Sequence, residues 1–281
     1  MKRVLIDKHG PDIGLADDHR FIAAQGLISG LWGCQMPIGD LTNVALFDDF
    51  DGATLLGTWG VLKGTDGAAA NFALNGGISG TALGTTGATT TTMAGSGIQI
   101  SGGLNFKAQG ALGTAGPNNL EFDARVQLSL ITGTCLFLGF TNQVATLQMP
   151  IQGSGAGNAL TANANDAVGF LYDTSMTTPH WYCVGVKGGV VASLIDCGSA
   201  PAANTYDQLH ISVDQLGNAN FWRNGNGVLA QSLQQPPSGA VTMAAAVTPT
   251  VALAPVCAAF ARIAASKNVV LDYLMASMDR I

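Results

Sequence analysis

The sequence predicts an all-β fold, an antiparallel β-sandwich preceded by an N-terminal arm that is extended or forms a short helix. Apolar and polar residues alternate with a period of two in several stretches, and turn-forming Gly and Asn residues recur between them. Helical periodicity is scarce. A length of 281 residues suits one large sandwich. We therefore expect an arm at residues 1–44 and a sandwich at residues 45–281.

The arm combines a charged start with an apolar stretch. No charged residue occurs between Phe21 and Ile38, but three glycines and a proline interrupt this run, which argues against a membrane helix. Asp17 or Asp18 can cap a short helix. The arm either packs on its own domain or docks on a neighbouring subunit, and we favour docking. The proposed assembly residues are Phe21, Ile22, Leu27, Ile28, Leu31 and Trp32.

The stretch LFDDFDGATLLGTW, residues 46–59, places three aspartates beside aromatic residues. Asp48, Asp49 and Asp51 offer oxygens to a calcium ion, and Asp272 in the last predicted strand offers another. Strand alternation directs Asp48 and Asp49 to opposite faces, so they do not converge on one ion. We interpret the stretch as the opening strand of the sandwich with a turn at Asp51-Gly52, and we expect no metal site.

The central part of the chain gives the clearest strand pattern. In NLEFDARVQLSL, residues 119–130, apolar residues alternate with Glu121, Asp123 and Arg125, which predicts one buried and one solvated face. Thr132-Gly133 then turns the chain into TCLFLGFT, residues 134–141, as in a hairpin.

Further strands and turns follow. QLHISVD, residues 208–214, repeats the alternation, with turns expected at Gly217-Asn218 and Asn224-Gly225. NVVLDYLMASM, residues 268–278, predicts a last long strand. The two low-complexity stretches are expected to be long loops or edge hairpins. They are GTTGATTTTMAGSG (84–97) and QGSGAGNALTANAN (152–165).

Three motifs in order resemble the concanavalin A-like lectin/glucanase family: FDDFDGATLLGTW, YDQLHISVDQLGNANFWRNGNGVLAQSL and VVLDYLMASM. They span roughly residues 46–281, and the resemblance implies a jelly-roll sandwich.

Enzymes of the family carry a Glu-x-Asp-x-Glu strand. The matching residues here are Glu121, Asp123 and Arg125, and arginine cannot serve as the acid/base. We expect no enzyme. A hydrolase would need a second carboxylate that faces Glu121 from another strand.

Sugar binding would use exposed aromatic rings and amides. The candidates are Trp181, Tyr182, Trp222 and Asn224. The four histidines, His9, His19, His180 and His210, show no metal-ligand spacing, and His210 is expected on the solvated face of its strand. No motif predicts a cofactor.

The composition restricts the partners. Charged residues make up 11% of the chain, against about 25% in average domains. The net charge is −6 and no basic cluster occurs, so we expect neither nucleic acid nor a membrane surface as partner. The five cysteines include no C-x-x-C pair, which favours buried free thiols from a reducing cytosol. A Cys183–Cys197 disulfide is the alternative.

These features together favour a non-enzymatic virion structural protein of a tailed bacteriophage. A capsid decoration (cement) protein is the first hypothesis, and a tail or fibre component is the second. A carbohydrate-binding, lectin-like module is the hypothesis from another class. The expected partners are further copies of the chain, as in a trimer, and the major capsid or other virion proteins. A host surface glycan is a further candidate partner, and the expected location is the virion, assembled in the host cytoplasm.

Overall fold

The computed structural model divides the chain into two units, Met1–Leu41 and Thr42–Ile281. It describes residues 43–52, 55–65, 71–75, 80–87, 93–103, 106–109, 119–155, 157–227 and 242–279. The first strand begins at Asn43, two residues before the predicted start of the sandwich. The predicted assembly residues of the arm lie outside the described residues. They are Phe21, Ile22, Leu27, Ile28, Leu31 and Trp32.

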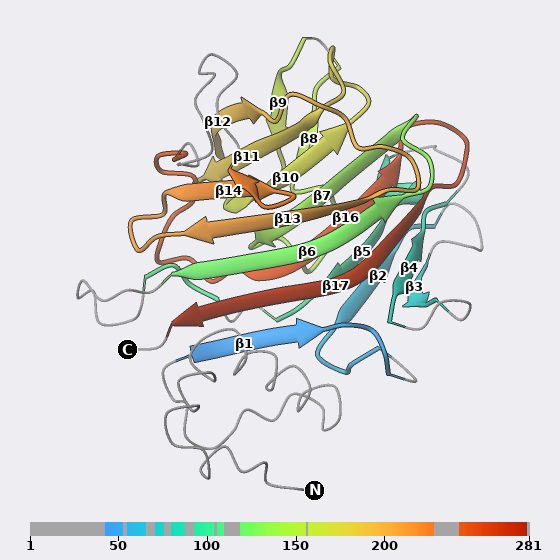
Figure 1. Cartoon of the computed structure of the whole chain (residues 1–281). Helices are drawn as coiled ribbons and strands as arrows, with labels where there is room; N and C mark the ends of the chain where they lie inside the picture. Colours follow the sequence, from blue (N-terminus) through green and yellow to red (C-terminus); the bar gives the residue numbers. More distant parts are fainter. Residues whose placement is uncertain are drawn as a thin grey trace, which may run out of the picture. The chain divides into compact units, whose positions relative to one another are not determined.

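Two large antiparallel sheets form the described part of the second unit (Figure 1). In the part of the chain that the structure describes, sheet A contains eight strands in the order β15-β14-β13-β6-β17-β4-β3, with β1 also paired to β17. Their bounds are β1 Asn43–Asp48, β3 Asn71–Leu74, β4 Ala82–Thr85, β6 Leu120–Leu128, β13 Tyr206–Val213, β14 Ala219–Arg223, β15 Asn226–Gly227 and β17 Asn268–Asp279.

Sheet B contains seven strands among the described residues, in the order β12-β11-β10-β7-β16-β5-β2. Their bounds are β2 Gly60–Lys63, β5 Ile98–Ser101, β7 Thr134–Thr141, β10 Ala167–Asp173, β11 Trp181–Lys187, β12 Val190–Asp196 and β16 Ala254–Ala261. A separate hairpin is formed by β8 (Ile151–Gly153) and β9 (Leu160–Ala162). The single turn of α2, Met93–Ser96, precedes β5, and no described helix is long and apolar enough to cross a membrane.

The fold class predicted from the sequence is confirmed, and so are its main strands. β6 alternates buried and more exposed positions as expected, and β17 covers the predicted closing strand. The predicted hairpin at Thr132-Gly133 is wrong, because β6 pairs with β13 and β17 in sheet A whereas β7 pairs with β10 and β16 in sheet B. The turn itself is present and carries the chain from one sheet to the other, and Gly133 has a φ of 63°, a backbone conformation that favours glycine. Asn224 and Gly225 have φ values of 52° and 75°, as a two-residue turn of the mirror-image type requires. The second low-complexity stretch forms the β8–β9 hairpin.

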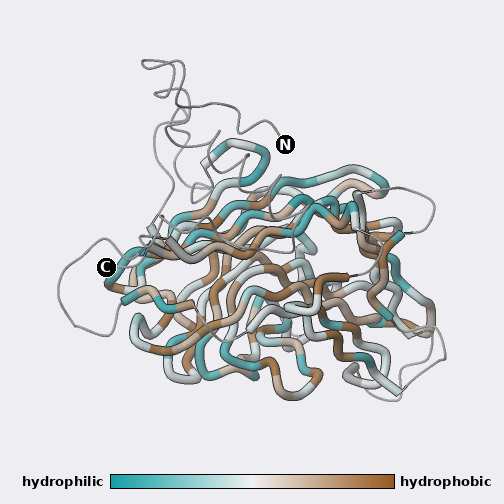
Figure 2. The backbone as a smooth tube through the Cα atoms, turned by 90° about the horizontal axis from the view of Figure 1, so that it is seen from below, coloured by the Kyte–Doolittle hydropathy of each residue, from teal (hydrophilic) through white to brown (hydrophobic). Residues whose placement is uncertain are grey.

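The main hydrophobic core lies between the two sheets, and apolar positions run along the strands of both layers (Figure 2). Its centre is an aromatic cluster in which Phe122 from sheet A packs edge-on against Phe140 from sheet B. Phe221 and Phe170 repeat this contact between the sheets, with ring centroids 5.4 Å apart. Edge-to-face aromatic pairs of this kind contribute about 0.5–1.5 kcal/mol beyond their buried area.

The aspartates of the opening stretch lie at and just after the end of β1, with Asp48 as its last residue. Asp48 is buried, and its carboxylate accepts hydrogen bonds from the Phe50 amide and from Trp59 Nε1, both at 2.8 Å. Burial raises the pKa of Asp48, and the two hydrogen bonds oppose this effect. The Asp48 carboxylate therefore fixes the backbone where the chain leaves β1, with Trp59 held beside it.

Candidate functional site

The outer face of sheet A carries a group of polar and aromatic side chains, which we call the polar face. Alternation along β6 directs Phe122 and Ala124 into the core and leaves Glu121, Asp123 and Arg125 on this side. The strands β13 and β17 lie on either side of β6, β14 lies beyond β13, and these three strands supply the rest (Figure 1). The polar face consists of Glu121, Asp123, Gln208, His210, Ser212, Trp222 and Tyr273.

His210 lies at the centre of the polar face, directly opposite Asp123 in the register of β13 and β6. Its Nε2 is 3.0 Å from Glu121 Oε2, and its Nδ1 is 3.2 Å from Asp123 Oδ2. Both ring nitrogens can donate to carboxylates only when the imidazole is protonated. Burial lowers the pKa of His210, but the hydrogen bonds and charges of Asp123 and Glu121 outweigh it and raise the pKa from 6.5 to about 9.

Neutral donors hold the same two carboxylates from their other sides. Ser212 Oγ donates to Glu121 Oε1 at 2.9 Å, and Tyr273 OH donates to Asp123 Oδ1 at 2.5 Å. Gln208 Nε2 adds longer contacts to Asp123, at 3.3 and 3.4 Å. Burial, followed by the hydrogen bond to Asp123, raises the pKa of Tyr273, so the phenol stays a donor at neutral pH. Donors from two strands, β13 and β17, thus fix the orientation of the carboxylates.

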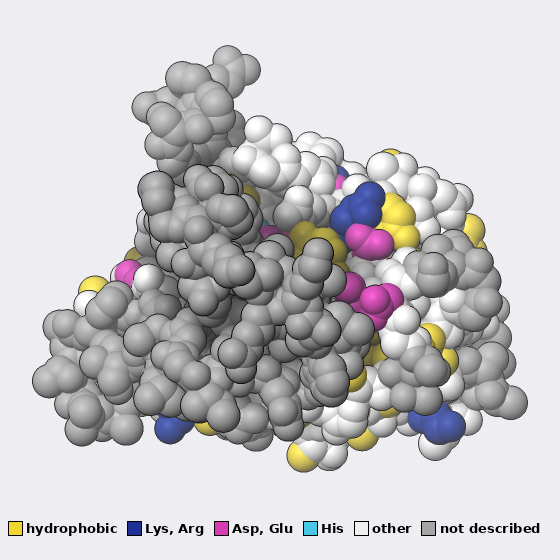
Figure 3. All heavy atoms as spheres, turned by 60° about the horizontal axis from the view of Figure 1, so that its bottom comes forward, with side chains coloured by type: hydrophobic (Ala, Val, Ile, Leu, Met, Phe, Trp, Pro, Cys, Tyr) yellow, Lys and Arg dark blue, Asp and Glu magenta, His cyan; other side chains and the backbone are white. Residues whose placement is uncertain are grey.

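Aromatic rings border the carboxylates. The Trp222 ring is partly exposed and lies 5.0 Å from the His210 ring, at an interplanar angle of 56°. The Arg125 guanidinium lies 4.3 Å from the centroid of Tyr206 and forms a 2.7 Å ion pair with Asp272. Figure 3 shows a face of the molecule on which Lys or Arg, Asp or Glu and hydrophobic side chains lie next to one another.

The four residues predicted to bind sugar do not lie together. Trp181 and Tyr182 are buried, so the expectation of exposed rings is wrong for both. Trp181 faces the inter-sheet core, whereas Tyr182 packs on the other side of sheet B and donates to the Thr178 carbonyl. Trp222 is partly exposed on the polar face. Asn224 is exposed in its turn, but its side-chain amide is used within the protein.

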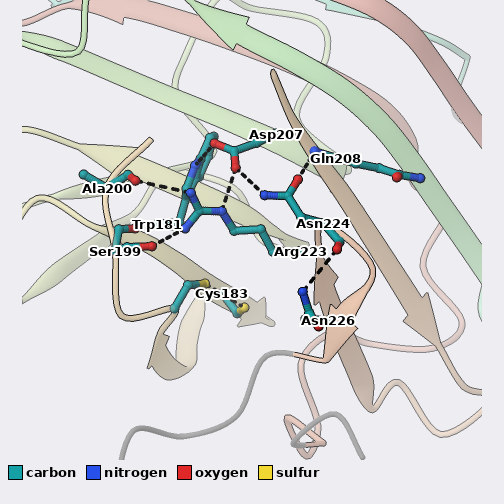
Figure 4. Close-up of polar contacts among 10 residues, drawn as sticks. Trp181, Cys183, Ser199, Ala200, Asp207, Gln208, Arg223, Asn224 and Asn226 are labelled. Atoms are coloured by element: carbon teal, nitrogen blue, oxygen red, sulfur yellow. Dashed lines mark hydrogen bonds and ion pairs between the residues drawn. The ribbon is translucent and has the colours of Figure 1, made fainter. Parts of the chain in front are cut away.

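A second polar network, centred on Asp207, explains the positions of Trp181 and Asn224 (Figure 4). The buried Asp207 carboxylate accepts hydrogen bonds from Trp181 Nε1 at 3.0 Å, Arg223 Nε at 2.8 Å and Asn224 Nδ2 at 3.0 Å. Arg223 also donates to Ser199 and to the Ala200 carbonyl. Trp181 belongs to sheet B and Asp207 to sheet A. The network therefore joins the two sheets at one edge and leaves few donors for a ligand.

The carboxylate that a hydrolase would need opposite Glu121 does not come from a paired strand in the described residues. The register places Ser212 of β13 and Ser277 of β17 beside Glu121. Arg125, at the position of the family's acid/base, is paired with Asp272. Among the described residues, no group of three or more His, Cys, Asp or Glu side chains could hold a metal ion.

Sequence reasoning identified Glu121, Asp123 and His210 as outward-facing residues, and the structure confirms this position for all three. It missed their convergence and the contributions of Gln208, Ser212 and Tyr273. Alternation along QLHISVD could have placed Gln208, His210 and Ser212 on one face. The pairing of that strand with β6 could not be read from the sequence.

No protein-family model matches the chain, and no curated protein matches its sequence. Solved structures do match its fold. The carbohydrate recognition domain of Emp47p is 8% identical with a TM-score of 0.50, over 85% of this chain and 98% of that one. Peanut lectin, in a structure with a 9mer peptide, is 9% identical with a TM-score of 0.52. The match covers 84% of this chain and 97% of that one.

A prokaryotic β-1,3-1,4-glucanase (lichenase) from a mouse hindgut metagenome is 9% identical with a TM-score of 0.51. The match covers 85% of this chain and 100% of that one. These likenesses establish that the chain has the concanavalin A-like lectin/glucanase sandwich. At such identities they establish the fold and nothing about the activity.

Proposed function

We propose that this chain is a non-catalytic carbohydrate-binding module that holds its ligand on the polar face of sheet A. The observation that carries the proposal is the pair of oriented carboxylates, Glu121 and Asp123, next to the partly exposed ring of Trp222. A sugar presents hydroxyl donors at its edge and apolar C–H groups on its face. Fixed acceptors and an aromatic surface complement these two features.

The arrangement supports binding more than it supports hydrolysis. A retaining hydrolase needs a carboxylate nucleophile and a second group that gives and takes a proton. Here the nucleophile position, Glu121, is neutralised by the His210 imidazolium at 3.0 Å. His210 keeps its proton up to a pKa of about 9, which makes it a weak acid at neutral pH. Arg125 cannot take over the role because its guanidinium stays charged.

The test is glycan binding by the full chain, with β-1,3-1,4-glucan oligosaccharides as the first probe and a glycan array as the second. We expect Trp222→Ala to raise the Kd for the glycan by at least about 10-fold, which corresponds to a loss of about 1.4 kcal/mol in binding free energy. Leu216→Ala is the matched control, because Leu216 is an exposed apolar residue in the turn between β13 and β14. Equal binding by wild type and Trp222→Ala would contradict the proposed site.

Catalysis is tested with the same oligosaccharides by following new reducing ends. We expect the wild type to release no more new reducing ends than a Glu121→Gln variant does. Release by the wild type that Glu121→Gln abolishes would show a hydrolase and overturn the non-catalytic part of the proposal.

The virion role remains a second hypothesis, supported by the 11% share of charged residues and by the uncharged run in the first 44 residues. It is compatible with a glycan-binding module displayed on a particle. Light scattering of the chain with and without residues 1–44 tests it. A trimer or larger assembly that becomes monomeric on truncation would support an assembly arm, and monomers in both cases would count against it.

A further inference from the structure

Two cysteine thiols lie in contact at the edge of sheet B. Cys183 belongs to β11, and Cys197 follows the last residue of β12. Their Sγ atoms are 3.6 Å apart, and both thiols are free. The Cys197 amide donates to the Trp181 carbonyl at 2.9 Å, which holds the two segments side by side.

The two thiols differ in access. Cys183 is fully buried, whereas Cys197 is partly exposed and is followed by two exposed residues, Gly198 and Ser199. Burial, and then the hydrogen bond with Cys197, raises the pKa of Cys183 well above the ordinary value. A reagent in solution therefore meets Cys197 first, and Cys183 stands directly behind it.

We propose that Cys183 and Cys197 form a redox-active dithiol that exchanges with low-molecular-weight disulfides such as oxidised glutathione. The Cys197 thiolate attacks one sulfur of the small disulfide, forms a mixed disulfide and releases one small thiol. Cys183 then loses its proton, and its sulfur attacks Cys197 Sγ and expels the second small thiol, which takes up a proton. The protein loses two electrons and two protons, and one small disulfide is reduced to two thiols.

The local backbone suits this closure. The Sγ atoms must approach from 3.6 Å to about 2.05 Å, the length of a disulfide bond. Cys183 pairs with Ile195, so Cys197 is its diagonal neighbour, and the bond requires a small shift of the chain after β12. That segment is a loop whose next residue, Gly198, has a φ of 81°. The disulfide would link this segment to β11. The same segment contains Ser199 and Ala200, which accept hydrogen bonds from Arg223.

Two other cysteines provide internal controls. Cys135 and Cys257 are fully buried, and Cys135 donates its thiol to Asp173 at 3.2 Å. Burial raises the pKa of both. In the folded chain neither should react with a small disulfide at the rate of Cys197.

The experiment uses the reduced full chain, incubated with oxidised glutathione and quenched with N-ethylmaleimide in denaturant before peptide mass analysis. We expect Cys183 and Cys197 to escape alkylation and to appear as a linked Cys183–Cys197 peptide. Cys183→Ala should instead accumulate the glutathione adduct on Cys197, because the resolving thiol is missing. Cys257→Ala should behave as the wild type.

The proposal fails if oxidised glutathione leaves Cys183 and Cys197 of the folded wild type open to alkylation but reacts with the same cysteines in the unfolded chain. It fails equally if wild type and Cys183→Ala carry the same stable adduct on Cys197, since Cys183 would then not resolve it. Both outcomes are independent of glycan binding, and the wild-type measurement decides even if a variant does not fold.

Discussion

The two large sheets use their outer faces differently. In sheet A, β6 and β13 alternate buried positions with half-buried or exposed ones. In sheet B, every residue of β7, β10 and β16 is buried. Sheet A therefore buries one face against the core and leaves the other accessible, whereas the centre of sheet B is covered on both faces.

The covering of sheet B is a second hydrophobic core. Residues of the β8–β9 hairpin and its neighbouring loops pack on the side of sheet B that faces away from sheet A, among them Met149, Ile151, Ala164 and Met176. The acidic group on this side, Asp173, is fully buried and paired with Arg262. The comparison teaches that similar charged pairs have different roles. The Asp173–Arg262 pair on the covered side of sheet B has a fully buried carboxylate, whereas both side chains of the Arg125–Asp272 pair on sheet A are reached by solvent.

The largest effect is expected from Asp173→Ala. The carboxylate accepts hydrogen bonds from the Gly153 amide at 2.8 Å, the Ser175 amide at 2.9 Å and Arg262 Nε at 2.9 Å. Its removal leaves the half-buried guanidinium and two amides without their partner, so we expect a loss of about 3–5 kcal/mol in the free energy of unfolding. Urea unfolding measures this loss of stability. A loss below about 1 kcal/mol would mean that the Asp173–Arg262 pair contributes no more than an exposed ion pair does.

A smaller, pH-dependent effect is expected from His210 on the open face. The folded-state pKa of about 9 exceeds the ordinary 6.5, so the folded chain holds this proton more tightly than the unfolded chain. The resulting stabilisation is complete below pH 6.5 and is lost as pH rises through about 9. Because the ring is partly exposed, we expect a difference of about 2 kcal/mol.

Urea unfolding between pH 6 and pH 10, compared for the wild type and His210→Gln, measures this contribution. The variant should lose the part of the pH dependence that the wild type shows above neutral pH. Parallel pH profiles for the two proteins would mean that Glu121 and Asp123 do not hold the imidazolium as the structure shows.

The sequence allowed the sheet-forming segments to be predicted because strand alternation is a local property. β6, β13 and β17 were recognisable from it, and so were the turns at Gly133 and Asn224-Gly225. The covering of sheet B was not predicted. TCLFLGFT and its partners show no alternation, and the chain that covers them includes part of the low-complexity stretch at 152–165 together with Met149, Ile151 and Met176.

The site was predictable in part for the same reason. The outward position of Glu121 and Asp123 follows from their own strand, but their contact with His210 depends on β6 pairing with β13 in one register. The sequence predicted an exposed ring for Trp181, which is buried, because an aromatic residue near a turn can face either the solvent or the core. The Asp207 partner that satisfies its indole N–H comes from the other sheet. Contacts between sheets carry no local sequence signal.

The smallest effect is expected from Asp272→Asn, the open-face counterpart of Asp173→Ala. Arg125 and Asp272 form a 2.7 Å pair between exposed or partly exposed side chains, and Arg125 also stacks on Tyr206 at 4.3 Å. Water screens such a pair, so its loss should cost less than about 1 kcal/mol in urea unfolding, and the difference from wild type should shrink further in 1 M salt. A cost equal to that of Asp173→Ala would mean that the two outer faces do not differ in how they stabilise the sandwich. A small cost would show that water screens the Arg125–Asp272 pair, as its exposure predicts.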